Sequence, residues 1–366
     1  MFALRFFPMF SLLAQISRQP SAPLQLWLRT TGQKFRPASP VPHRAVVRHR
    51  QNALLTAGLA GPHQCATLQV EQRPGPTPTV VIGGFVPDST EALYLLRGGL
   101  LQQGSLYYFN YPRRGFSTEM FFAQLADLVE ELSENSDRLP VILGISFGAG
   151  LVMEWLRRFD RPENQPALAG LVLVSPVGCV EDLLDPTKPK PTTLLGRVIK
   201  PYVDADGRAD GAVIERSRSV FLKMFESGAQ NKEALRLLLS REELGRLRDA
   251  VLATINSIEP AAARDRVQAL CNFSPFRIVR PLCVAPVLVL FSEKESAVLC
   301  ENAPTERELR TRTTLWFPQG RCLTVRNHED NPVQHASLIF HARNFQPLLA
   351  GFYRSLRQKQ RQRRAA

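Results

Sequence analysis

Residues 141–150 read VILGISFGAG, and this stretch decides which fold the chain adopts. Its first half, Val141–Ile145, is continuously apolar like a buried strand, and a helical pattern follows through Leu156. The turn between them, Gly144-Ile145-Ser146-Phe147-Gly148, has the spacing G-x-S-x-G. A strand that turns sharply into a helix strains its turn residue, and the flanking glycines Gly144 and Gly148 avoid clashes there. We therefore expect the Ser146 hydroxyl to project at a helix N-terminus, which stabilises negative charge.

The segments around this turn predict an α/β fold with a mostly parallel central sheet flanked by helices. From residue 65 onward, short apolar runs alternate with helical patterns such as Ser117–Leu132. Most of the runs are continuously apolar, as strands buried on both faces should be. The expected strands are Cys65–Glu71, Thr79–Ile82, Leu106–Asn110, Pro140–Ile145, Leu171–Ser175, Val287–Ser292 and Cys322–Arg326.

The alternation of strands and helices stops between about Pro176 and Pro286. This interval has no good strand, but it has helical patterns, for instance Leu244, Leu247, Val251, Ile255 and Ile258. A helical insertion of this length between two strands of a sheet would form a lid. We therefore expect a helical cap at about residues 177–285, inserted before the penultimate strand.

These features together resemble the α/β-hydrolase fold, and the resemblance covers roughly residues 65–356. It implies that Ser146 is a nucleophile and that the backbone N–H groups of Phe85 and Phe147 form an oxyanion hole. The early turn Val81-Ile82-Gly83-Gly84-Phe85 has Gly83 where the family often has His, but a backbone donor needs no particular side chain. The loop 111–117, YPRRGFS, is similar to the family's R-G-x-S loop.

The family order of the catalytic residues is Ser, acid, His, which implies a histidine after Ser146. His335 follows the last expected strand by a short loop and leads into a helical pattern, as the resemblance requires. His328 lies nearer the end of the strand and is the second candidate, whereas His341 is expected inside the following helix. The other three histidines, His43, His49 and His63, precede Ser146.

The resemblance places the acid after the penultimate strand. There, Glu293-Lys294-Glu295-Ser296-Ala297-Val298 is similar to the family's G-x-x-D-x-x-V stretch, and Glu295 aligns with the acid. Glu293 stands two residues too early. A glutamate can orient the histidine as an aspartate does, provided that the loop accommodates the additional methylene. Some family members have the acid one strand earlier, where Glu181 and Asp182 are the alternatives.

The net charge of +13 comes from the two ends of the chain. Residues 1–70 contain eight basic and no acidic residues, and residues 354–366 add six more basic residues. Between them, 32 basic and 33 acidic residues give a net charge of −1. The basic ends are typical of solvated tails, and they also favour contact with an anionic membrane surface. No specific nucleic-acid binding is expected.

The N-terminal stretch 1–16, MFALRFFPMFSLLAQI, is too short and too interrupted by Pro8 to cross a bilayer. It fits an apolar arm packed on the body, an interfacial anchor or a cleaved targeting segment. The six scattered cysteines form neither a disulfide framework nor a zinc motif. We expect a cytoplasmic or peripheral membrane protein without a metal or nucleotide cofactor.

The sequence thus predicts a basic arm at residues 1–64, a hydrolase domain at residues 65–356 and a basic tail at residues 357–366. The expected function is hydrolysis of a carboxylic ester or thioester, with a lipid-like acyl group under the cap. Two alternatives are an acyltransferase on the same fold and a hydrolase-like protein that binds without catalysis.

Overall fold

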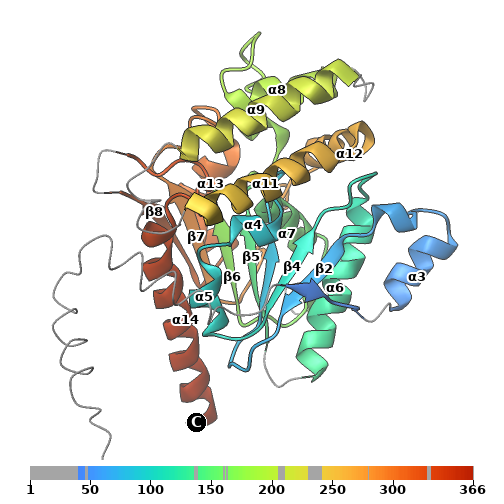
Figure 1. Cartoon of the computed structure of the whole chain (residues 1–366). Helices are drawn as coiled ribbons and strands as arrows, with labels where there is room; N and C mark the ends of the chain where they lie inside the picture. The colour runs from blue at the N-terminus through green and yellow to red at the C-terminus, as the bar shows by residue number, and fades with distance from the viewer. Residues whose placement is uncertain are drawn as a thin grey trace, which may run out of the picture.

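The computed structural model describes residues 40–45, 48–135, 139–159, 161, 164–204, 211–229, 241–278, 280–327 and 331–365. In this part of the chain, eight strands form one sheet in the order β1-β2-β4-β3-β5-β6-β7-β8 (Figure 1). Strands β3 to β8 are parallel, whereas β2 pairs antiparallel with β1 and β4. The strands are β1 (Val41–Pro42), β2 (Thr67–Glu71), β3 (Thr79–Ile82), β4 (Leu106–Asn110), β5 (Val141–Ile145), β6 (Gly170–Val174), β7 (Val287–Ser292) and β8 (Gly320–Val325).

All seven expected strands are present, with ends that differ from the prediction by two residues or fewer. This confirms the predicted mostly parallel sheet. Strand β1 is additional and lies before residue 65, where the sequence predicted only an arm. It has two residues, both exposed, and so it lacks the apolar pattern that marks a strand.

Helices cover both faces of the sheet, as Figure 1 shows. Helices α6 (Thr118–Asn135) and α7 (Phe147–Arg157) belong to one apolar layer, and α5 (Arg97–Leu101) and α14 (Ala342–Ala365) belong to the other. Side chains alternate between the two layers along each strand, so that Val80 and Ile82 join the first and Val81 joins the second. Burial on both sides explains why the strands are continuously apolar.

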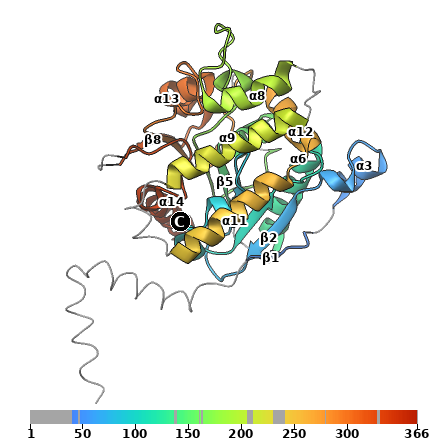
Figure 2. The same cartoon turned by 45° about the horizontal axis from the view of Figure 1, so that its top comes forward.

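In the described part of the interval between β6 and β7, four α-helices gather beyond the carboxyl ends of the strands (Figures 1 and 2). They are α8 (Leu194–Asp204), α9 (Gly211–Ala229), α11 (Arg241–Ser257) and α12 (Pro260–Cys271). Side chains of α9 and α11 form a third apolar cluster with Ile339 and Phe340. The remaining elements are α3 (His49–Thr56), η2 (Pro62–Gln64), α4 (Ser89–Ala92), η4 (Val180–Asp182) and α13 (Pro304–Trp316).

Part of the expected N-terminal arm belongs to the folded body. Helix α3 contacts α6. Arg48, which precedes α3, and Arg50 within it pair with acidic side chains of α6. Arg48 contacts Glu134 at 2.5 Å, and Arg50 contacts Glu130 at 2.5 Å and the fully buried Asp127 at 3.0 Å. The positive charge of residues 40–64 is therefore largely matched by α6.

The structure describes the C-terminal end of the chain up to residue 365, but not the first 39 residues. The expected basic tail is the last part of α14, which continues to Ala365. Residues 1–39, with the apolar stretch 1–16, lie outside the described residues. Among the helices that are described, none has both the length and the apolar composition needed to cross a bilayer.

Candidate active site

Ser146 occupies the turn between β5 and α7. Its φ of 51° and ψ of −116° lie outside the regions that most residues adopt, as the strand–turn–helix spacing predicts. Its backbone N–H donates to the Val174 carbonyl on the neighbouring strand at 2.8 Å. The residue is 7% exposed. The turn therefore presents the serine hydroxyl at the N-terminal end of α7, at the carboxyl edge of the sheet.

The two glycines of the motif are required by close backbone approach. A Cβ at Gly148 would lie 2.3 Å from the Gly83 carbonyl oxygen, so α7 packs directly on the end of β3. A Cβ at Gly144 would lie 2.8 Å from the Ala149 Cα. After β3, the chain adds β4 on one side of this strand and then β5 on the other, so the strand order changes direction between β3 and β5. α/β sheets commonly bind ligands at such a point.

His335 lies beside Ser146, although 189 residues separate them. Its Nε2 is 2.9 Å from the Ser146 Oγ, and its Nδ1 is 2.5 Å from an Oε2 of Glu295. The side chains of His335 and Glu295 are 7% and 6% exposed. The serine, histidine and acid that the sequence singled out are therefore in one hydrogen-bonded line.

The Glu295 carboxylate is held from behind by two further donors. Its Oε1 accepts from the Ser292 backbone N–H at 2.5 Å and from the Ser175 hydroxyl at 2.8 Å. The Ser175 Oγ in turn accepts from the Ala336 backbone N–H at 3.1 Å. The Glu295 side chain thus points back toward Ser292, the last residue of its own strand, where the longer glutamate reaches a backbone donor.

Ser175 is a site residue that sequence reasoning did not single out. It follows β6 directly and has a φ of 44°. From the end of this strand, its hydroxyl links Glu295 to Ala336, the residue after His335. Its place after a buried strand was a usable signal, because the carboxyl ends of parallel strands meet at one edge of the sheet.

The alternative histidines have other surroundings. His328 lies outside the described residues. The His341 Nδ1 is 3.0 Å from the Ser337 Oγ, one helical turn away, and its side chain is buried. Burial lowers the pKa of His341 below its ordinary range, which favours a neutral ring.

The alternative acids do not reach His335. Asp182 is fully buried and accepts backbone N–H bonds from Gly178, Cys179 and Thr305 at 2.8 to 3.2 Å. Burial raises its pKa against the effect of these donors. Glu181 is exposed, and Glu293 accepts from the Asn327 N–H at 3.3 Å. Asp182 thus joins η4 to the start of α13 instead of orienting the histidine.

The backbone N–H groups of Phe85 and Phe147 make no hydrogen bond to a described residue. Their rings stack at 4.3 Å between centroids and 11° between planes, and the Phe273 ring also stacks with Phe147 at 5.8 Å between centroids. A Cβ at Gly84 would lie 3.4 Å from the Ser146 Cβ, so the Phe85 loop passes directly beside the serine. Both amides are therefore free to donate to an oxygen atom near Ser146.

The glycine at position 83 has a steric explanation. Its N–H donates to the Ser89 Oγ at 2.9 Å, and a Cβ would lie 3.1 Å from the Ser89 backbone nitrogen. Ser89 therefore occupies the space that a side chain at Gly83 would need. The Gly83 carbonyl accepts from the buried Tyr111 hydroxyl at 2.7 Å, which fixes the start of the loop. Further along the 111–117 loop, Ser117 caps α6 by accepting the Met120 N–H at 3.2 Å.

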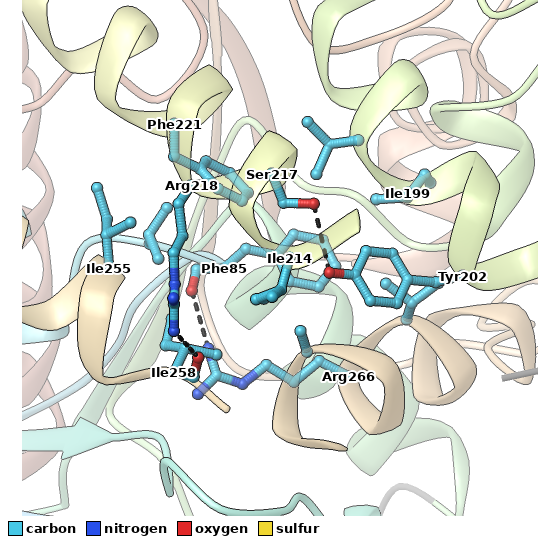
Figure 3. Close-up of a pocket in the computed structure, with 14 residues that line it drawn as sticks. Phe85, Ile199, Tyr202, Ile214, Ser217, Arg218, Phe221, Ile255, Ile258 and Arg266 are labelled. Carbon is cyan, nitrogen blue, oxygen red and sulfur yellow. Dashed lines mark hydrogen bonds between the residues drawn. The ribbon is translucent and has the colours of Figure 1, made fainter. Parts of the chain in front are cut away.

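Arg266 of α12 holds the loop after β3 at Phe85, as Figure 3 shows. Its guanidinium donates to the carbonyls of Phe85 and Pro112, both at 3.0 Å, and lies 4.9 Å from the centre of the Tyr111 ring. Arg266 is 2% exposed, and burial lowers its pKa to about 10, so it stays charged at neutral pH. No local pattern marks this residue, because an arginine in a helix that contains another one stands out only by its burial.

A cavity of about 950 Å³ opens above Ser146 and His335. Its walls come from α8, α9 and α11 and from the segment after His335. A second, small cavity of about 40 Å³ lies between α8, α9, α11 and α12 (Figure 3), and it shares Phe85, Val86, Phe221 and Ile255 with the first. The larger volume lies in the range of sites that enclose small organic molecules. In the described part of the chain, no cluster of three or more His, Cys, Asp or Glu residues could hold a metal ion.

Solved structures of known proteins share this arrangement of strands and helices. A putative aryl esterase from Burkholderia cenocepacia is 17% identical, with a TM-score of 0.54 over 80% of this chain and 96% of its own. An epoxide hydrolase from Bacillus megaterium, solved as a point mutant, is 10% identical, with a TM-score of 0.55 over 78% and 96%. A bacterial membrane phospholipase A is 13% identical, with a TM-score of 0.55 over 95% and 96%.

The chain has the α/β-hydrolase fold, which confirms the fold that the sequence resembles. No family model matches the sequence. Among curated proteins, none has a significantly similar sequence.

Proposed function

We propose that the protein is a serine hydrolase that cleaves a carboxylic ester or thioester. The observation that carries this proposal is the line from the Ser146 Oγ through His335 to Glu295, with distances of 2.9 and 2.5 Å. A serine hydroxyl is a weak nucleophile at neutral pH and needs a base in this position. The structural likeness to esterases supports ester hydrolysis in general.

In the proposed first half-reaction, the Ser146 Oγ attacks the carbonyl carbon while the His335 Nε2 accepts the hydroxyl proton. Glu295 holds the His335 Nδ1–H and stabilises the imidazolium that forms. The negative charge that develops on the carbonyl oxygen is met by the backbone N–H groups of Phe85 and Phe147, which have no other acceptor in the described residues. The alcohol or thiol then leaves with the proton from Nε2.

In the second half-reaction, water hydrolyses the acyl-enzyme by the same steps. His335 accepts a proton from the water, the hydroxide adds to the acyl carbon, and Ser146 leaves with the proton returned by Nε2. We propose that helices α8 to α12 act as a cap that excludes bulk water from the acyl-enzyme. Their apolar cavity walls support this role.

A fluorophosphonate probe tests this proposal, because labelling requires an activated serine. We expect the wild-type protein to be labelled and to hydrolyse 4-nitrophenyl butyrate. Ser146→Ala should lose both, and His335→Ala should lose three or more orders of magnitude in kcat. Ser337→Ala is a matched control, because Ser337 also lines the cavity but is outside the hydrogen-bonded line.

Two results would contradict the proposal. Full esterase activity in Ser146→Ala would exclude Ser146 as the nucleophile. Activity that survives in His335→Ala but not in His328→Ala would assign the base to the alternative histidine. Circular dichroism of each variant shows that the fold is retained.

A further inference from the structure

Among the described residues that line the large cavity, three have cationic side chains and none has an anionic one. Arg197, Lys223 and Lys294 line the cavity, and all three are exposed. No Asp or Glu is among the described residues that line it. None of the three side chains forms an ion pair with a carboxylate in the described part of the chain. Their charges are therefore available to a ligand.

The three cations come from three segments that contact one another around the site. Arg197 follows Leu194, whose N–H donates to the Ala297 carbonyl at 3.2 Å, so the start of α8 docks on the loop that contains Lys294. The Lys294 N–H donates to the Val333 carbonyl at 2.9 Å, two residues before His335. The cations on these two segments therefore lie on the side of the cavity near the catalytic histidine.

Lys223 comes from α9, which docks on the chain just after His335. The ring of Phe225 on α9 contacts Phe340 edge to face at 5.3 Å between centroids. A Cβ at Gly228 would lie 2.4 Å from the Phe340 ring, so the end of the helix packs closely there. The third cation is thus held on a helix that is anchored beside the site.

The walls below these cations are apolar. Leu195, Val220, Phe221, Met224, Val251 and Ile255 line the cavity from α8, α9 and α11. An alkyl chain leaves water favourably on such a surface. The three cations lower the free energy of a bound anion, because charges beside an apolar wall interact more strongly than in bulk water.

We propose that the substrate is a lipophilic ester that also carries an anionic group, either a carboxylate or a phosphate. This inference rests on the proposed ester hydrolysis and names the substrate class of the same site. The alkyl part packs against α8, α9 and α11, and the anion contacts Arg197, Lys223 and Lys294. Neutral esters of the same length are expected to be poorer substrates.

Matched esters test the proposal by activity. The variant Arg197→Gln/Lys223→Gln/Lys294→Gln should lose at least tenfold in kcat/KM on 3-carboxy-4-nitrophenyl octanoate. The same variant should lose much less in kcat/KM on neutral 4-nitrophenyl octanoate, so that the loss is specific to the anionic ester. The control variant Lys188→Gln/Arg277→Gln/Arg321→Gln removes three exposed cations that do not line the cavity, and it should match wild type on both esters. The preference for the anionic ester should also shrink as salt rises to about 0.5 M.

Binding to the Ser146→Ala protein tests the proposal without turnover. Calorimetric titrations with decyl phosphate, decanoate and decanol should give tighter binding of at least one anion than of decanol. The cavity triple variant should weaken the binding of that anion at least tenfold, and the comparison of phosphate with carboxylate identifies which anion the site prefers.

The outcomes separate this inference from the proposed function. Equal losses on the two esters, or equal effects of the cavity and control variants, would overturn the anionic substrate class while leaving ester hydrolysis in place. A protein that hydrolyses neither ester but binds decyl phosphate through the three cations would overturn the hydrolase and retain the ligand class. Equal binding of decanol and both anions would overturn the ligand class.

Discussion

Ser175 shows how one side chain outside the cavity can determine the geometry of the site. Its hydroxyl donates to Glu295 and accepts from the Ala336 N–H, so it ties the acid to the chain that carries His335. The side chain is fully buried and does not line the cavity, so it has no direct contact with a substrate there. We therefore assign Ser175 as a positioning residue for the proposed reaction.

We expect Ser175→Ala to lower kcat by about 10-fold to 100-fold with little change in KM. The alanine leaves one oxygen of Glu295 with a single donor and removes the hydroxyl that accepts from the Ala336 N–H. Steady-state kinetics on 4-nitrophenyl butyrate and the rate of fluorophosphonate labelling should fall together. A variant that melts at a lower temperature but keeps its kcat would show that Ser175 has only a structural role. Ser133→Ala, whose hydroxyl donates to the Val129 carbonyl within α6, is the control.

At the scale of elements, the loop after β3 is held between the sheet and the inserted helices. Tyr111 binds its first carbonyl at Gly83, and Arg266 of α12 binds the carbonyl of Phe85. Helix α9 is tied to the end of α11 by Arg218, which donates to the Ile258 carbonyl at 2.9 Å (Figure 3). Arg218 also donates to the Asn256 carbonyl at 2.9 Å. The inserted helices therefore help to set the loop that carries one proposed oxyanion donor, in addition to covering the cavity.

Arg266→Met should reduce kcat by about 10-fold or more, because the Phe85 loop loses a fixed contact and its N–H points less accurately. KM for a short neutral ester should change little. Arg266→Lys should recover part of the loss, since a lysine can still donate to one carbonyl. Arg264→Met on the same helix, with a side chain that is 42% exposed, is the control and should keep its kcat.

A purely stabilising role of Arg266 predicts a different result. If the arginine only stabilised α12, the variant would unfold at a lower temperature while the folded fraction kept its kcat. Thermal unfolding measured beside the kinetics distinguishes the two accounts.

At the scale of the whole molecule, the charge is divided between a nearly neutral body and basic ends. Arg48 and Arg50 are paired with α6, whereas five basic residues lie in residues 1–39 and three in residues 360–366. Lys359 of α14 contacts the Gln319 Oε1 at 2.9 Å, so this helix stays on the body up to the start of that last segment. We propose that the basic ends attract the protein to an anionic membrane surface and have no part in the chemistry.

Removal of residues 1–39 and 360–366 should leave kcat on a soluble ester within about twofold. It should weaken co-sedimentation with vesicles of phosphatidylglycerol and phosphatidylcholine, because eight basic and no acidic residues are lost. Binding of the full chain should also fall as salt rises to about 0.5 M. Binding that persists in high salt but is lost without residues 1–20 would favour an apolar anchor. A full chain that does not bind these vesicles would contradict both membrane accounts.

Local patterns were enough to predict the sheet and the candidate nucleophile at its edge. Apolar runs marked the strands, and the G-x-S-x-G spacing marked the strained turn at Ser146, because both follow from short-range steric and burial requirements. His335 and Glu295 followed from the order and placement of catalytic residues that the resemblance to α/β-hydrolases implies. Strand β1 was not predicted, because two exposed residues carry no such pattern.

Contacts between distant segments were decided only by the tertiary structure. Ser175 binds Glu295 across 120 residues, and Arg266 binds Phe85 across 181. The place of Ser175 after a buried strand indicates that it lies at the sheet edge, but neither its sequence nor that of Arg266 indicates which distant residue it contacts. Its partner is set by how the strands and helices pack, and a buried polar group must then find that partner because leaving it unpaired costs free energy. The chain's local patterns therefore determined its fold and its candidate nucleophile, whereas packing decided what holds the acid and the oxyanion loop.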